Sequence, residues 1–169
     1  MTRNPLLWPF RSQFLAGAVI CAALLAYALF EQYQMGVEPC PLCSLQRVAF
    51  VAAGLVFLAG AIHAPLARLG RGIYTILVLL AVLTGIAIAW RHLWLQSLPP
   101  DQVPDCGPGL AYMLDAFPLS RTLKLVFTGS GECAVVNWRF LGLAMPAWSL
   151  IWFVLLGVWA AWSGFRKRS

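Results

Sequence analysis

Residues 38–62 read EPCPLCSLQRVAFVAAGLVFLAGAI, and this stretch decides the fold class. Cys40 and Cys43 come first, Arg47 follows four positions after Cys43, and almost everything beyond it is apolar. A helix needs about 20 apolar residues, with a range of roughly 17 to 25, to cross the hydrocarbon core of a bilayer. The stretch therefore predicts a membrane-spanning helix that carries a pair of thiols at its entrance.

The composition of the whole chain also indicates a membrane protein. Of its 169 residues, 61% are hydrophobic and 11% are charged, whereas soluble domains carry about 25% charged residues. The runs long enough, or nearly so, to cross a bilayer are 14–30, 45–62, 73–90 and 146–165. We predict an all-α membrane protein, a single integral domain over residues 1–169 that forms a four-transmembrane-helix bundle. Its two outer loops are expected at about 31–44 and 91–145.

The basic residues predict an orientation. Seven of them, with no acid among them, flank the expected spans on one side: Arg3, Arg11, Arg68, Arg71, Arg166, Lys167 and Arg168. Because cytoplasmic flanks collect Lys and Arg, we expect this side to be cytoplasmic. The net charge of +6 is then explained by topology and contacts with anionic lipids rather than by nucleic acid. A cleavable signal ending near Ala26-Tyr27-Ala28 is an alternative for the first span, which would leave the same sidedness.

The second outer loop has two parts. Residues 97–109, SLPPDQVPDCGPG, contain four prolines and two glycines, which predicts an irregular and mobile arm. In residues 110–127 apolar side chains recur at helical spacing on either side of Pro118. This pattern indicates a short helix that either covers the bundle or lies in the headgroup plane, and we favour the interfacial position.

The five cysteines fall into two groups. Cys21 lies in the middle of an apolar span, where a thiol behaves as a small hydrophobic group. Cys40, Cys43, Cys106 and Cys133 lie two by two in the outer loops, where disulfides persist.

Three interpretations compete for the four loop cysteines. A structural zinc site is one, although 26 residues separate Cys106 from Cys133, and such sites usually offer two tight pairs. Inert disulfides are the second, and a link between those two cysteines would stabilise the loop by roughly 3–4 kcal/mol. Two redox-active pairs are the third and the favoured one, because CxxC is the arrangement of dithiol oxidoreductases. Four cysteines allow three pairings, so the resting connectivity stays open.

The entrance of the second span has the chemistry of a thiol site. We expect Cys43 there, with Pro39 and Pro41 keeping the preceding backbone extended and Ser44 able to cap the helix. Free N–H groups at a helix start stabilise an anion, so a Cys43 thiolate should be favoured.

Arg47 lies on the same helical face as Cys43, about one turn deeper. A charged residue in a span either snorkels or serves a site, and beside a thiolate it could hold a lipid-soluble acceptor with polar carbonyl groups. His92, at the outer end of the third span, could donate to the acceptor's other oxygen. Between Trp90 and Trp94 it could equally belong to an aromatic belt.

Taken together, these features resemble the disulfide bond formation protein B (DsbB) family of bacterial inner membranes. The resemblance rests on CPLC, on Arg47, on the pair Cys106 and Cys133, and on GSGECAVVNWRFLGLAMPAW at 129–148, and it covers nearly the whole chain. It implies a quinone-dependent thiol-disulfide oxidase with both termini cytoplasmic and its redox loops periplasmic. Its partner would be a DsbA-like thioredoxin-fold protein and its acceptor ubiquinone or menaquinone.

The resemblance also implies roles for individual residues. Cys106 would form a mixed disulfide with the partner and Cys133 would resolve it towards Cys40. Cys43 would give electrons to the quinone beside Arg47. His92 would be a further quinone contact. The sequence PDCGPG around Cys106 departs from the family and could change the choice of partner.

Two other classes of protein share some of these features. A reductase of the vitamin K epoxide type carries its CxxC near the start of the last span, whereas residues 146–165 contain no cysteine. A four-span structural protein with passive disulfides or a zinc site is the alternative that is not an enzyme, and thiol titration with metal analysis would distinguish it.

Overall fold

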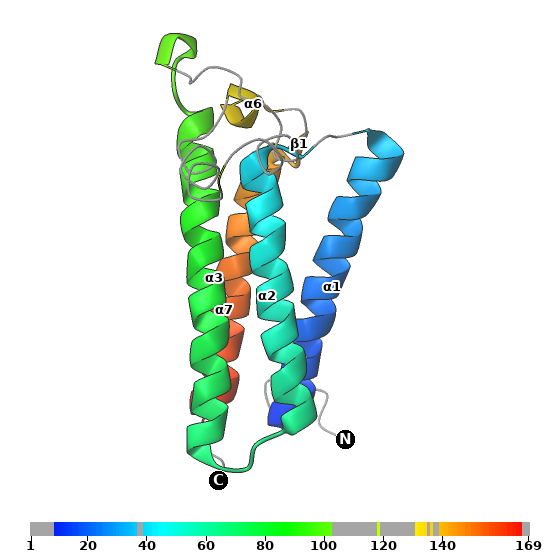
Figure 1. Cartoon of the computed structure of the whole chain (residues 1–169), viewed down its shortest axis with the longest axis vertical. Coiled ribbons are helices and arrows are strands. Elements are labelled where there is room, and N and C mark those ends of the chain that lie inside the picture. The colour runs from blue at the N-terminus through cyan, green and yellow to red at the C-terminus, as the bar shows by residue number, and fades with distance from the viewer. Residues whose placement is uncertain are drawn as a thin grey trace.

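The computed structural model describes residues 9–36, 39–102, 118, 131–134, 136 and 139–166. Four long helices dominate it: α1 (Phe10–Met35), α2 (Pro41–His63), α3 (Arg68–Gln96) and α7 (Met145–Phe165). The short elements are η2 (Pro100–Gln102), α6 (Gly131–Ala134), β1 (Arg139–Phe140) and β2 (Leu143–Ala144). The long helices alternate in direction, so that α1 begins and α7 ends at the same end of the bundle (Figure 1).

All four long helices have the length and apolar composition needed to cross a membrane. The prediction of an all-α protein with four spans is therefore confirmed. Apart from Pro118, the predicted helix in 110–127 lies outside the described residues, as do Cys106 and most of the proline-rich arm, from residue 103 onwards.

The helices extend beyond the apolar runs that predicted them. The run at 14–30 becomes a helix from Phe10 to Met35, and the run at 73–90 becomes one from Arg68 to Gln96. In lipid each backbone N–H and C=O must find its partner within the helix. α3 therefore starts before its apolar run and ends after it, and so includes polar residues such as Arg71 near its start and Gln96 at its end.

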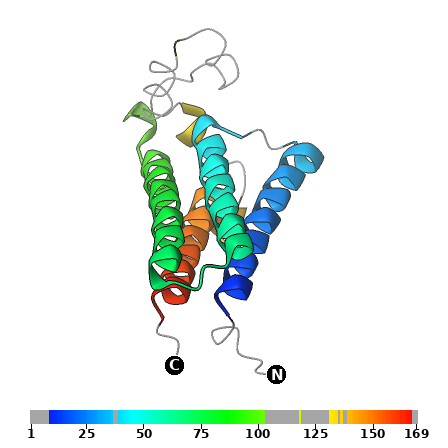
Figure 2. The ribbon, with the colours of Figure 1, turned by 60° about the horizontal axis from the view of Figure 1, so that its bottom comes forward.

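Three helix pairs pack extensively and one does not. α3 packs along α7, and α2 packs against both α1 and α3, whereas α1 and α7 meet over a much shorter stretch. Figures 1 and 2 both show α1 leaning away from the other helices towards the end that carries α6. The space between α1 and α7 at that end becomes important for the site.

Aromatic rings and glycines together form the core of the bundle. Phe50 of α2 stacks on Phe153 of α7, with ring centroids 4.0 Å apart and planes 12° apart. The Phe153 ring lies so close to α3 that a Cβ added at Gly85 would overlap it. The glycine is thus required by the close approach of α7.

A short hairpin leads into α7. β1 and β2 pair antiparallel, with Arg139 opposite Ala144, and the turn between them places Leu141 and Gly142 at φ 51° and 81°. Two consecutive positive φ angles are typical of the tight turns that match strand twist. The indole Nε1–H of Trp148 donates to the Phe140 carbonyl at 3.1 Å, which holds the hairpin against the first turns of α7.

Replacing Gly85 by alanine should destabilise the bundle by about 1–3 kcal/mol, because the new methyl group overlaps the Phe153 ring. Gly72→Ala on the same helix is the matched control, since a Cβ there meets nothing within 4 Å. Thermal unfolding of the purified protein in detergent measures both. A Gly85→Ala midpoint equal to that of Gly72→Ala would contradict the packing described.

Candidate functional site

The site begins at the N-terminus of α2, where a cysteine caps the helix. Cys40 is the N-cap residue, Pro41 occupies the first helical turn, and the Cys40 sulfur accepts from the Cys43 backbone N–H at 3.4 Å. The sequence predicted Ser44 as a possible cap, which is wrong. Its hydroxyl lies one turn inside the helix and donates to the Cys40 carbonyl at 3.3 Å.

The two CxxC sulfurs face each other but differ in exposure. They lie 3.2 Å apart, with the Cys40 thiol donating to the Cys43 sulfur. Cys40 is buried, whereas Cys43 is half-buried. The pair is therefore asymmetric, with one sulfur turned into the protein and the other towards an opening.

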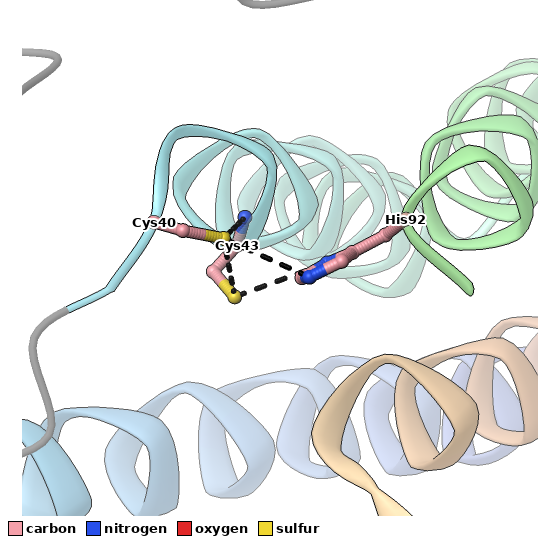
Figure 3. A group of neighbouring side chains, drawn as sticks. All are labelled: Cys40, Cys43 and His92. Atoms are coloured by element: carbon pink, nitrogen blue, oxygen red, sulfur yellow. Dashed lines mark hydrogen bonds between the residues drawn. The ribbon is translucent and has the colours of Figure 1, made fainter. Parts of the chain in front are cut away.

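His92 of α3 lies beside both sulfurs. Its Nε2 is 3.8 Å from the Cys40 sulfur and its Nδ1 is 4.0 Å from the Cys43 sulfur, as Figure 3 shows. Nε2 also lies 3.1 Å from the Cys133 carbonyl, and Nδ1 lies 3.1 Å from the Gln46 amide nitrogen. A carbonyl can only accept, so Nε2 carries the proton and Nδ1 accepts from Gln46. His92 thus links α2, α3 and α6.

Cys133 joins the same cluster. It lies in α6, is fully buried, and packs among Cys40, Leu42, Ile88 and Leu95. Three of the four loop cysteines that the sequence selected therefore lie together at one end of the bundle. The fourth, Cys106, is outside the described residues.

A cavity of about 460 Å³ opens on the other side of Cys43. Its walls come from α1, α2, β1 and α7, and most of the lining is apolar, including Phe50, Phe140 and Trp152. The polar groups on its walls are Tyr27, Cys43, Gln46, Arg47 and Ser149. A mainly apolar cavity with a few polar groups is typical of a small-molecule site.

Arg47 crosses from α2 to α1 at the wall of this cavity. Its Nη1 donates to the Gln32 side-chain oxygen and its Nη2 donates to the Ala28 carbonyl at 3.0 Å. The guanidinium is thereby held at the cavity wall, one helical turn from Cys43. Planar donors of this kind bind oxygen acceptors well.

Sequence reasoning missed several residues of the site. Gln32 and Gln46 are polar residues within helices long enough to span the membrane, which is the signal that could have revealed them. Phe140 gave no such signal, because it reaches the cavity only through the hairpin. His92 is not among the residues that line the cavity and lies at the sulfurs instead.

The sulfurs and the imidazole could also hold a metal ion. The Cys40 sulfur, the Cys43 sulfur and a ring nitrogen of His92 all lie within 4.8 Å of one another. Thiolate and imidazole are ligands that zinc prefers. Within the described residues this set differs from the four-cysteine zinc site considered from the sequence, since a histidine is one of its members.

Fold and site together define a four-helix membrane protein with a dithiol centre beside an apolar cavity. Residues 10–163 match the family described as "Disulfide bond formation protein DsbB". The chain is 47% identical over 165 residues to disulfide bond formation protein B of Xanthomonas euvesicatoria pv. vesicatoria, covering 98% of this chain and 96% of the relative.

Two further relatives with the same name are 54% identical. That of Nitrosococcus oceani aligns over 149 residues, 88% of each chain. That of Methylococcus capsulatus aligns over 150 residues, 89% of this chain and 91% of the relative. The chain belongs to the DsbB family.

In the reduced protein, N-ethylmaleimide should modify Cys43 before Cys40, because the Cys43 side chain borders the cavity and Cys40 is buried. Cys21 is the internal control: it is 1% exposed within α1 and should react only after unfolding. Mass spectrometry of samples quenched at successive times measures the order. Modification of Cys40 ahead of Cys43 would contradict the asymmetry of the pair.

Proposed function

We propose that this protein is a thiol-disulfide oxidase that passes electrons from protein dithiols to a membrane quinone. The observation that carries the proposal is the arrangement of Cys43 and Arg47 on one wall of an apolar cavity, with the Cys40 sulfur 3.2 Å from that of Cys43. A dithiol placed there can give up two electrons to a molecule that reaches it from the lipid. Membership of a family named for disulfide bond formation supports the reaction class.

The cavity fits the head of a quinone, either ubiquinone or menaquinone. Its apolar lining suits a ring, and the Arg47 guanidinium at the wall is a charged donor suited to a carbonyl oxygen. When bound, a quinone would supply an acceptor for two electrons and two protons. Gln32 and Ala28 hold the guanidinium in place before anything binds, which reduces the cost of ordering it.

The buried side of the pair suits exchange with a second disulfide. Thiol-disulfide exchange proceeds by attack of a thiolate on a sulfur through a mixed disulfide. Cys133 and Cys40 share one buried cluster, which favours Cys40 as the sulfur that exchanges with the second pair. Cys43 is then left to face the cavity, in agreement with the roles that the family resemblance implies.

The partner is proposed to be a DsbA-like thioredoxin-fold protein of the periplasm. A strongly oxidising dithiol protein can be regenerated only by a more oxidising acceptor, and a membrane quinone meets that need. Cys106 is the proposed point of attack, in the segment whose PDCGPG sequence can influence the choice of partner.

The orientation follows from charge. Four arginines of the described chain lie where α1 and α3 begin and α7 ends: Arg11, Arg68, Arg71 and Arg166. No acidic residue whose side chain the structure describes shares that end, since Glu31 lies in the last turns of α1 and Asp101 in η2, which follows the end of α3. We infer a bacterial inner-membrane protein with this end cytoplasmic and its cysteines periplasmic.

Quinone reduction by a reduced thioredoxin-fold substrate should be lost in Cys43→Ala and slowed roughly 10- to 100-fold in Arg47→Ala, as expected for one lost charged hydrogen bond of about 1.5–3 kcal/mol. Loss of quinone absorbance measures the rate. Arg91→Ala is the matched control, because Arg91 lies at the same end but stacks on Trp94, 4.2 Å from the ring centroid. Unchanged turnover in both site variants would reject the assignment, and stoichiometric zinc in an inactive wild type would favour the structural alternative.

A Cys133→Ala variant should accumulate a covalent complex in which Cys106 is bound to the partner, because the cysteine that resolves the mixed disulfide is missing. Non-reducing electrophoresis of trichloroacetic acid-quenched cells followed by mass spectrometry identifies the attached protein. Cys106→Ala/Cys133→Ala should trap nothing and serves as the control. A complex with a cytosolic protein would contradict both the partner and the orientation.

A further inference from the structure

A buried acid lies near the end of α1 that carries the cavity. Glu31 is 7% exposed, and its Oε2 is buried without a hydrogen-bond partner. The Arg47 guanidinium donates to Gln32 and the Ala28 carbonyl, and within the described part of the chain no ion pair joins it to Glu31. A buried carboxyl oxygen left without a partner costs free energy of folding, so its presence next to a reaction site requires an explanation.

Glu31 is connected to the cavity through Tyr27. The two residues are four apart on α1 and so share a face, and their side chains are hydrogen-bonded. Tyr27 lines the cavity. Among the described lining residues, Tyr27 and Ser149 carry hydroxyl groups, and that of Tyr27 is bonded to a carboxyl group.

The reaction proposed above needs protons as well as electrons at this cavity. A dithiol that becomes a disulfide gives up two electrons and two protons, and reduction of a quinone to a quinol takes up the same number. Arg47 lines the cavity but cannot release its proton. Cys43 lines the cavity from α2, whereas Tyr27 lines it from α1, so Tyr27 is placed to give a proton to an acceptor oxygen that lies away from the thiol pair.

We propose that Tyr27 and Glu31 form a proton relay from water at the end of α1 to the acceptor in the cavity. This inference rests on the proposed function. The Glu31 carboxylate takes a proton from water at the end of α1, the Tyr27 hydroxyl gives a proton to a quinone oxygen, and Glu31 passes its proton on to the tyrosine oxygen. One thiol proton leaves to water in exchange, so protons and electrons balance.

Single-turnover reduction of a short-chain ubiquinone by the reduced full-length protein tests the relay. Tyr27→Phe and Glu31→Gln should each lower the rate about tenfold or more, since general acid catalysis contributes roughly 10²–10⁴-fold. Glu31→Asp keeps a carboxyl group and should retain most of the rate. Tyr33→Phe, at a side chain 75% exposed on the same helix, and Asp101→Asn, at the same end of the bundle, are matched controls and should equal wild type.

A second readout separates proton transfer from a structural role. Infrared difference spectra of quinone reduction should contain a carboxyl C=O band that is sensitive to deuterium oxide, absent in Glu31→Gln and retained in Asp101→Asn. Trp148 and Trp152 line the cavity, so quenching of their fluorescence by added quinone measures quinone binding. The affinity should be the same in Glu31→Gln as in wild type.

The outcomes are distinguishable. Wild-type rates in Tyr27→Phe and Glu31→Gln, or a carboxyl band that persists in Glu31→Gln, would overturn the relay while leaving the quinone oxidase intact. A wild-type protein that reduces no quinone would overturn the oxidase and the relay together. Slow reduction accompanied by lost quinone binding would assign Glu31 to the shape of the cavity and so reject proton transfer.

Discussion

The attachment of Arg47 to α1 is the interaction on which the site depends. α1 packs along α2 but meets α7 only briefly, so one wall of the cavity belongs to a helix that is held from one side. The guanidinium bonds to Gln32 and Ala28 tie that helix to the turn of α2 that follows Cys43. Because Arg47 also lines the cavity, the same group that positions the wall faces whatever binds there.

The start of α2 imposes a second constraint, which gives the Cys40 and Cys43 thiols different surroundings. The first N–H groups of a helix have no partner within it, and here the Cys40 sulfur accepts from one of them, the Cys43 N–H. Capping turns Cys40 inwards, towards His92 and Cys133, and leaves Cys43 on the cavity side. The start of one helix thus places one sulfur in the buried cluster and the other at the cavity.

Much of this could be predicted from sequence because the signals were local. Length and hydropathy identified four spans, and the spacing of Cys43 and Arg47 placed them on one helical face, as the cavity wall bears out. Cys106 stays a prediction, since it lies outside the described residues.

The remainder of the site depends on contacts that periodicity does not encode. The capping role of Cys40, the bridge of His92 from the sulfurs to the Cys133 carbonyl, and the placement of Phe140 each need elements far apart in sequence to meet. Gln32 is such a case too, because a polar residue in a spanning helix suggests a site but does not identify the arginine of the neighbouring helix that bonds to it.

The hairpin that precedes α7 has a consequence for how far Cys133 can travel. β1 starts at Arg139, six residues after Cys133, and is fastened to α7 through Trp148. Six residues span at most about 20 Å when fully extended. Cys133 can therefore lie no farther than about 20 Å from the start of β1, the strand whose Phe140 lines the cavity, unless that strand moves with it.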